Sequence, residues 1–400
     1  MREVNFKHTE IGPIPHDWEV FSVGNDCYIK ARIGWQGLTT AEYLDHGEYG
    51  LITSTDIVDG KINWQTCWFV SEERYRQDTK IQICEDDVLI SKDGTIGKVG
   101  IVKKLPYPAT LNSGVFVIRT RNSKQSQKGL SLAFISSYFD DFIKRLTAGS
   151  TIVHLYQKDI VNYAYPLPPT LAEQERIAGA LSSIDTLIGA LYEQIEKKRH
   201  IKQGTMQQLL TGKKRLAGFT GEWVTEIIKD ICDRYDHLRI PVAANFRIKG
   251  LTPYYGANGI QDYVDGYTHD GEFILLAEDG ANNLVDYPIR YVSGKIWVNN
   301  HAHVLSAKEK KADTRFLAYV LKTIDFESNI VGSGRAKLNA ETLMQLEVSI
   351  PPTIAEQSAI AAVLSRMDTE IAALEQKRDK YIAIKSGMMQ DLLTGKIRLV

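Results

Sequence analysis

One segment occurs twice in this chain of 400 residues. PPTLAEQ begins at Pro168 and PPTIAEQ begins at Pro351, and the match runs without a gap, at a fixed offset of 183, to LLTGKKRL and LLTGKIRL. Of the 49 paired positions, 28 are identical. Two copies do not make a solenoid, which needs at least three stacked units. We therefore expect two similar halves, in which the repeat is the scaffold and the dissimilar blocks do different versions of one task.

Both copies of the repeat carry the signals of one long helix. Pro-Pro blocks a helix upstream, and Thr170 and Thr353 are each followed three residues later by glutamate, the spacing of a capping box. Apolar residues then recur at alternating steps of four and three, as in a coiled-coil seam. Gly204 and Gly387 weaken the helix signal late in each copy. The predicted seam consists of Ile177, Leu181, Ile184, Ile188 and Leu191 in the first copy and Ile360, Leu364, Met367, Ile371 and Leu374 in the second.

The blocks outside the repeats are predicted to be mixed α/β domains. Short runs of branched and aromatic residues near glycines indicate strands at 87–94, 114–120, 272–280 and 295–305. One helical stretch is expected in each block, at 130–146 and 313–326.

These elements predict an α/β (α+β) protein with a pseudo-two-fold repeat. Trp18 and Trp223 open the two blocks in similar contexts, which indicates a shared frame. We expect an N-terminal segment with a first domain, a long helix, a second domain and a second long helix, bounded at 1–167, 168–216, 217–350 and 351–400.

Composition limits the class of protein. The N-terminus has no apolar run typical of a signal peptide, and no stretch of 18 apolar residues is present to span a bilayer. The four cysteines form no CxxC pair, which argues against a zinc ribbon and favours a reduced, cytoplasmic protein. The net charge of −1 argues against a uniformly basic nucleic-acid coat but allows a local basic face.

A search for catalytic motifs finds none that is convincing. The Pro-Pro pairs read LPPT and IPPT instead of the Asn/Asp-Pro-Pro-aromatic turn of an adenine methyltransferase, and the sequence has neither a P-loop nor a GxSxG elbow. His301 and His303 could share a strand face and bind a metal, but no nearby Cys or third His completes a set, so packing or polar contact is favoured over a metal site. The acidic run at 85–87, ahead of Lys92, is interpreted as a turn before a strand rather than a nuclease set. We therefore expect no catalytic, cofactor-binding or metal-binding residues.

Nucleic-acid contact is better supported, by clusters of glycine, basic and amide residues. Glycine lets a backbone approach a phosphate, lysine neutralises the phosphate, and amide side chains bond to base edges. For each residue alone a solvated loop is the simpler interpretation, so the prediction depends on clustering. The candidates in the first block are Ser91, Lys92, Asp93, Gly94, Thr95, Lys98, Asn112, Ser113 and Ser150. Those in the second block are Tyr254, Tyr255, Asn258, Asn282, Asn283, Asn299, Asn300, Arg335 and Lys337.

One charge run lies in the first repeat. From Lys197 to Arg215 there are seven Lys or Arg residues and no acidic residue. This run fits either a solvated helix face or a basic surface for DNA phosphate or an acidic partner.

The order of these pieces resembles the specificity (S) subunits of type I DNA restriction-modification enzymes. TEIGPIPHDWEV, which begins at Thr9, is similar to the opening of that family's first recognition domain. LPPTLAEQERIAGALSSID and IPPTIAEQSAIAAVLSRMD are similar to its two conserved regions. TPYYGANGIQDYVDG, LLAEDGANN and GKIWVNNHAHVL, all within 252–305, resemble a common type of recognition domain. The resemblance covers essentially the whole chain.

The resemblance implies two target recognition domains, each of which reads one half of a split DNA sequence in the major groove. The two long helices would pair antiparallel as a spacer coiled coil. Two DNA-methyltransferase (M) subunits would bind these helices and carry S-adenosylmethionine and the adenine-N6 chemistry. Restriction (R) subunits that use ATP and Mg would join them for cleavage. The chain itself would bind double-stranded DNA as a non-catalytic cytoplasmic subunit, with no contact to a membrane.

Three other functions remain open. One is the equivalent subunit of a methyltransferase-nuclease fusion system that has no separate translocase. A second, of a different class, is a coiled-coil adaptor with two protein-binding domains. The third is an enzyme with an unfamiliar active site. A salt-dependent DNA shift assay with the methyltransferase present separates a DNA-reading subunit from an adaptor.

Overall fold

The computed structural model describes residues 5–148, 154–326 and 337–399. Ser150 and Arg335, two of the candidate contacts, lie outside these ranges. Contacts divide the chain into a first unit, Met1–Ala190 with Lys377–Val400, and a second unit, Leu191–Gln376. Each unit therefore combines one block with the first half of one long helix and the second half of the other.

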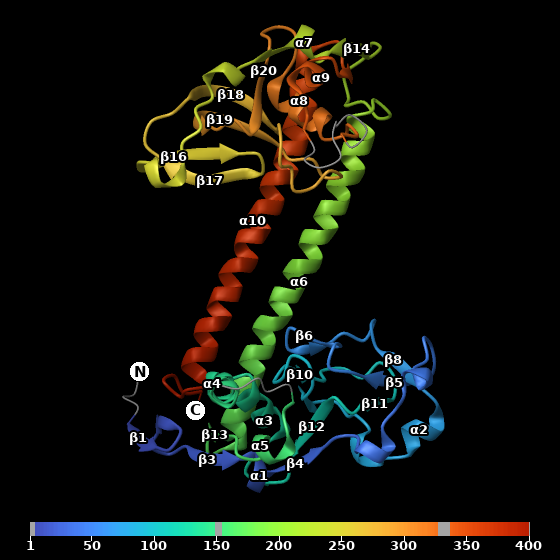
Figure 1. Cartoon of the computed structure of the whole chain (residues 1–400), viewed down its shortest axis with the longest axis vertical. Coiled ribbons are helices and arrows are strands. Elements are labelled where there is room, and N and C mark those ends of the chain that lie inside the picture. Colours follow the sequence, from blue (N-terminus) through green and yellow to red (C-terminus); the bar gives the residue numbers. More distant parts are fainter. Residues whose placement is uncertain (1–4, 149–153, 327–336, 400) are drawn as a thin grey trace. The chain divides into compact units, whose positions relative to one another are not determined.

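The two repeats form the long helices α6 (Leu171–Leu209) and α10 (Ile354–Leu392), each of 39 residues (Figure 1). Thr170 Oγ1 accepts the Glu173 N–H at 3.3 Å and Thr353 Oγ1 accepts the Glu356 N–H at 3.4 Å, so both threonines cap their helices. Both helices continue through their late glycines. They end earlier than the repeat because the TGK turn that follows places its glycine at positive φ.

In the first unit, the block is built on several small sheets. The main sheet has the antiparallel order β10-β9-β12-β4. Its strands are β4 (Cys27–Lys30), β9 (Val88–Ser91), β10 (Val99–Ile101) and β12 (Val115–Thr120). A second sheet, in the order β11-β5-β8, consists of β5 (Tyr49–Ile52), β8 (Trp68–Val70) and β11 (Ala109–Leu111). The remaining pairs are β1 (Phe6–Thr9) with β2 (Gly12–Pro15), β6 (Ile57–Val58) with β7 (Lys61–Ile62), and β3 (Glu19–Ser22) with β13 (Ala164–Leu167).

Short helices complete this block. They are α1 (Val23–Asp26), α2 (Glu72–Arg76), α3 (Gln127–Phe134), α4 (Ser137–Thr147) and α5 (Gln157–Ile160), with 3-10 turns at Gly34–Gln36, Thr40–Glu42 and Thr79–Ile81. The stretch at 130–146, expected as one helix, is thus two helices. The break follows Phe134, where the Ser136 hydroxyl donates to the Ala133 carbonyl at 2.6 Å.

The second block is built on one six-stranded sheet in the order β15-β20-β18-β19-β16-β17. The strands are β15 (Cys232–Arg234), β16 (Lys249–Gly256), β17 (Gly259–Val264), β18 (His269–Ala277), β19 (Ile289–Val298) and β20 (Ala302–Ala307). Pairs are antiparallel except β16 with β19. Helix α8 (Thr314–Leu321) packs on the sheet, with α7 (Ile228–Ile231), α9 (Ala340–Met344), turns at Asp236–Leu238 and Ala244–Phe246, and the pair β14 (Val224–Ile227) with β21 (Glu347–Ile350).

A common frame surrounds these different sheets. In each unit the strand after the opening tryptophan pairs antiparallel with the strand that enters the long helix: β3 with β13, and β14 with β21. One helical turn and a buried cysteine follow, Cys27 in one unit and Cys232 in the other. The blocks therefore differ in their interiors while their entrances and exits are alike.

Candidate nucleic-acid interface

The glycine-rich loop of the first block is closed around Ser91. The buried Ser91 hydroxyl accepts the Lys98 N–H at 2.9 Å and donates to the Thr95 carbonyl at 2.6 Å. Gly94 and Gly97 have φ values of +71° and +77°, which side chains rarely adopt. Ser91 therefore shapes the loop from inside, while Gly94 is exposed at its tip.

Lys92 and Asp93 of this loop line a cleft of about 330 Å³. The Lys92 ammonium lies 5.3 Å from the centre of the Phe116 ring, and Asp93 Oδ1 is 2.5 Å from His154 Nδ1. Lys30 lines the same cleft. The cleft thus gathers cationic and hydrogen-bonding groups, the chemistry that phosphate and base edges require.

Two other candidates of the first block, Asn112 and Ser113, lie beside the glycine-rich loop. Asn112 Oδ1 accepts the Gly114 N–H at 2.8 Å and its amide nitrogen lies 3.4 Å from the Tyr43 hydroxyl. Ser113 between them is exposed. Asn112 therefore holds a turn, and Ser113 is available to a partner.

In the second block, two candidates are buried and already bonded. Tyr254 is 1% exposed, and its hydroxyl lies 2.9 Å from the Val242 N–H. Asn299 is 5% exposed and accepts the His301 N–H at 2.8 Å. As with Ser91, their polar atoms are used internally. These three buried side chains therefore shape the surface from inside, and their direct contact with DNA stays a prediction.

Asn258 ties two exposed turns of the second block together. Its side chain donates to the Gly280 carbonyl at 2.9 Å and accepts the Asn282 N–H at 3.0 Å. Asn283 caps the next turn by accepting the N–H groups of residues 285 and 286. Asn258, Asn282, Asn283 and Asn300 lie at or near the surface, so their remaining amide groups are within reach of a partner. This loop pair is the densest amide cluster among the described candidates.

The two histidines of β20 and its preceding turn belong to an ion-pair network. His301 Nδ1 lies 2.6 Å from Asp279, and His303 Nδ1 lies 2.7 Å from Asp236. His303 Nε2 faces the Leu338 carbonyl at 2.8 Å. Among the described residues, Asp236, Glu278 and His303 form the one group able to offer three converging metal ligands.

Cations already neutralise the carboxylates of this network. Arg239 lies 2.6 Å from Glu278 and 3.7 Å from Asp236. The candidate Lys337 lies 3.0 Å from the other Glu278 oxygen. Burial raises the pKa of Glu278, but hydrogen bonds from Arg239 and Lys337 hold that pKa below its usual value. The arrangement fits the expected polar contact rather than a metal site.

The predicted seam residues lie on the buried face of each long helix. Ile177 and Leu181 pack with Leu392 and Leu393 in the first unit. Ile360, Leu364 and Met367 pack with Leu209 of α6 in the second. The start of each seam therefore meets the end of the other helix, as antiparallel segments require. Buried seam positions also include Ile184, Ile188, Leu191 and Ile371, whereas Met367 and Leu374 are half-buried.

Repeat-related ion pairs join the helices within each unit. In the first unit, Arg398 contacts the buried Glu173 at 2.7 and 2.8 Å. In the second, Arg215 contacts the buried Glu356 at 2.5 Å through two nitrogens. The expected capping boxes are therefore only half formed, because these glutamates bond to an arginine beyond the end of the other helix.

A second repeated pair involves aspartate and lysine. Asp185 lies 2.6 Å from Lys385 in the first unit, and Asp368 bonds to Lys202 in the second. Burial raises the pKa of Asp185, but Lys385 and Lys103 together hold that pKa below its usual value.

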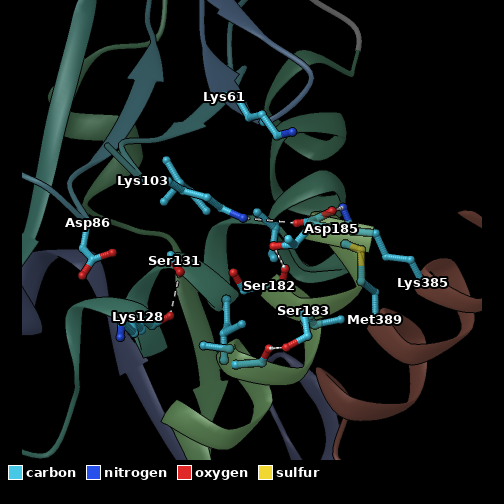
Figure 2. Close-up of a pocket in the computed structure, with 18 of the residues that line it drawn as sticks. Lys61, Asp86, Lys103, Lys128, Ser131, Ser182, Ser183, Asp185, Lys385 and Met389 are labelled. Carbon is cyan, nitrogen blue, oxygen red and sulfur yellow. Dashed lines mark hydrogen bonds and ion pairs between the residues drawn. The ribbon is translucent and has the colours of Figure 1, made fainter. Parts of the chain in front are cut away.

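Each unit has a cleft between its block and a long helix. One wall of each cleft is formed by equivalent residues of the two repeats. The first, of about 720 Å³, is shown in Figure 2, where Lys103 reaches Asp185 at 3.4 Å. The second has about 420 Å³. The shared wall is Ser182, Asp185 and Thr186 in the first unit and Ser365, Asp368 and Thr369 in the second. The opposite walls come from the dissimilar blocks, so each cleft has one constant and one variable side.

Within the part of the chain that the structure describes, no helix combines the length and apolar character needed to cross a membrane.

The family follows from a comparison with known sequences. The model of the type I restriction modification DNA specificity domain matches residues 15–197 and again 220–383. The chain belongs to this family. The two matches coincide with the two block-and-helix repeats, and the family's function is DNA sequence specificity.

Individual relatives agree with this assignment. A candidate type I restriction enzyme specificity subunit of Haemophilus influenzae is 42% identical over 154 residues, 38% of this chain and 39% of that protein. The MjaVIII specificity subunit of Methanocaldococcus jannaschii is 24% identical over 439 residues, 100% of this chain and 97% of that protein. The fold is similar to the crystal structure of a type I restriction-modification S subunit from M. genitalium. That match has a TM-score of 0.69 at 15% identity and covers 94% and 96% of the two chains.

Proposed function

We propose that this chain reads a bipartite DNA target as the specificity subunit of a type I restriction-modification system. The observation that carries the proposal is the repetition of one frame around two unlike blocks. Each unit has the same paired entry strands and the same Arg–Glu pair, but the enclosed sheets differ in strand number and order. One frame with two unlike interiors suits a target with two unlike halves.

The long helices act in this proposal as an antiparallel coiled coil that relates the two repeats by a pseudo-two-fold. Support comes from the buried a/d positions and from the repeat-related ion pairs within each unit. A pseudo-two-fold is also what two equivalent partners require, because each partner copy needs the same surface.

Two methyltransferase subunits bind these equivalent surfaces. Six helix positions are identical and exposed in both repeats. Gln207 and Gln390 form one of these pairs, and the other five pairs lie on one face. At about 100° per residue they fall within roughly 60° of one another, on the side of the helix away from the seam. They are Ala172, Thr186, Ala190, Lys197 and Ile201 in α6, and Ala355, Thr369, Ala373, Lys380 and Ile384 in α10. Because α6 and α10 present the same surface, each helix can bind one copy of the same partner.

In this proposal the partner subunits, and not this chain, carry out the chemical reactions. The methyltransferase subunits carry S-adenosylmethionine and methylate adenine at N6, and the restriction subunits use ATP and Mg. The chain contributes DNA contacts, for which Lys92, Thr95, Ser113, Asn258, Asn282, Asn283 and Asn300 are the best placed of the described candidates.

The decisive experiment maps methylated adenines. The chain is expressed with its methyltransferase subunit in a host that lacks adenine methylation, and single-molecule sequencing reads the modified positions. We expect one target of two unlike half-sites separated by a fixed spacer. Methylation at a single continuous site, or methylation by the purified chain without a partner, would refute the proposal.

A further inference from the structure

The cleft of the second unit is lined by cations from three separate elements. Arg290 lies on β19, Arg315 lies on α8, and Lys322 directly follows α8. Tyr255 of β16 and Ile260 of β17 complete this side of the cleft. The cleft belongs entirely to the second unit.

The two arginines of this set bond to neutral groups. Arg290 donates to the Asn258 carbonyl at 3.2 Å and Arg315 donates to the Tyr291 hydroxyl at 3.1 Å. Among the described residues neither they nor Lys322 forms an ion pair with a carboxylate. Asp368, the single acidic residue of the lining, is already bonded to Lys202 and to the Tyr319 hydroxyl. The lining therefore carries an excess of positive charge.

The pKa of Lys322 reflects the same excess of positive charge. Although Lys322 is exposed to solvent, desolvation by the surrounding protein lowers that pKa, and the charges of Lys202 and Arg290 lower it further, whereas Asp368 and Asp286 act in the opposite direction. A cation in such surroundings gains more from an added anion than one already paired.

The corresponding cleft of the first unit is different. Its lining contains four lysines and four acids: Lys61, Lys103, Lys128 and Lys385 against Asp59, Asp86, Glu175 and Asp185. Because the helix wall is the same in both clefts, the excess of positive charge is a property of the second block. The repeated scaffold does not require this excess of positive charge, because the first cleft lacks it.

The arginine geometry suits a tetrahedral anion. The Arg315 guanidinium lies 4.5 Å from the centre of the Tyr291 ring, which holds its plane and leaves further N–H groups unused. Phosphate oxygens are acceptors only and match a set of donors without acceptors, whereas base edges present donors and acceptors together.

We propose that this cleft binds the phosphodiester backbone of duplex DNA beside the second half-site, with Arg290, Arg315 and Lys322 as the phosphate contacts. This inference rests on the proposed DNA-reading function. The contacts hold the duplex in register and carry no sequence information.

The test measures DNA binding by the chain assembled with its methyltransferase subunits, over a series of salt concentrations. Arg290→Gln, Arg315→Gln and Lys322→Gln each remove one cation. Each is expected to reduce the slope of log K against log salt by about one unit. Affinity should fall equally for the target and for a duplex with an altered second half-site, so discrimination is unchanged.

Two control variants sharpen the result. Arg315→Lys keeps the charge and should retain the wild-type slope. Lys311→Gln removes an exposed cation of the same unit that does not line the cleft, and should change neither slope nor affinity. Thermal unfolding and size-exclusion chromatography check that every variant folds and assembles.

Three outcomes would overturn the inference. An unchanged slope in all three glutamine variants would mean that the cleft does not contact phosphate. Relaxed preference at one base position would make the affected arginine a base reader. Loss of subunit assembly with normal folding would assign the cleft to an acidic segment of a partner protein. If the wild-type assembly itself showed no sequence-specific DNA binding, the proposed function would fail, and that result differs from all three.

Discussion

The guanidinium of Arg398 forms two hydrogen bonds with the buried carboxylate of Glu173, 225 positions earlier in the chain. Two further bonds from Arg398 reach Asp17 at 2.8 and 2.9 Å. One side chain thus connects the N-terminal segment, the start of α6 and the segment that follows α10. Arg215 and Glu356 repeat the arginine–glutamate contact in the second unit.

Removing Arg398 should destabilise the first unit. Arg398→Met leaves the carboxylate of Glu173 buried and without its partner, which costs about 3 kcal/mol of unfolding free energy. Urea unfolding measures the change. Arg199→Met, which removes half-exposed ion pairs with Glu196 and Glu375, is the matched control and should cost less than about 1 kcal/mol. Equal losses for the two variants would contradict the importance of burial.

Two glycines of the repeat should respond in opposite ways to alanine. A Cβ at Gly395 would lie 2.3 Å from Pro15 Cγ, and the φ of this glycine is +71°, so Gly395→Ala should lower the melting temperature. Gly204 lies within α6, and a Cβ added there would meet nothing within 4 Å. Gly204→Ala should therefore stabilise the helix by about 1 kcal/mol. Calorimetry of both variants checks this, and stabilisation by Gly395→Ala would be inconsistent with the packing.

Stability should depend on pH through Asp185. The folded-state pKa of Asp185 is below its ordinary value, because Lys385 and Lys103 outweigh the effect of burial. Its contribution is therefore complete above the unfolded-state pKa and is lost as pH falls through the folded-state pKa. Asp185→Asn should be less stable than wild type at pH 7 by up to about 1 kcal/mol, and the difference should vanish in strong acid. Denaturant curves from neutral to strongly acidic pH give the measurement; a gap that persists unchanged would exclude this origin.

The two blocks should be separable readers. Replacing residues 20–165 by the matching block of a relative keeps both long helices and exchanges most of the β3–β13 pair for that of the relative, so only one half-site of the methylated target should change. Adenine mapping of the hybrid reads both half-sites at once. A simultaneous change in both half-sites would mean that the blocks do not read independently.

The repeated helix face should bind methyltransferase at each end. Ala190→Arg and Ala373→Arg place a large charge at equivalent positions of this face. Each single variant should lose one of two methyltransferase subunits, and the double variant should lose both, as measured by light scattering. Ser386→Arg, which places the same charge at an exposed position of α10 outside this face, serves as the control. Unaltered stoichiometry in the double variant would place the partner elsewhere.

The sequence predicted elements best where a pattern was long. Both long helices begin within three residues of the Pro-Pro pairs, because a long run of apolar spacing leaves few alternatives. The run at 295–305 was expected as one strand but is two, since Asn299 and Asn300 lie in the turn between β19 and β20. A short turn with amide residues inside an apolar run is hard to predict, because it hardly changes the spacing of the apolar residues.

The candidate site was less predictable, because its residues come together through long-range contacts. Ser91, Tyr254 and Asn299 look like surface groups in sequence, yet each is buried in the folded chain. Arg290, Arg315 and Lys322 share no motif, because a strand, a helix and the residue after that helix supply them separately. Glu173 and Glu356 carried a local capping signal, but their actual partners lie in the other repeat, which no local pattern reveals.

The division into units has a consequence for synthesis on the ribosome. The second unit is continuous from Leu191 to Gln376, whereas the first needs Lys377 and the residues after it to complete its packing. The residues of the second unit are therefore all synthesised before the first unit receives the Arg398 that neutralises Glu173. A circular permutant that begins at Lys377 and ends at Gln376 would make the first unit continuous and complete it before the second. Nascent-chain proteolysis of this permutant would then detect early protection of the first unit.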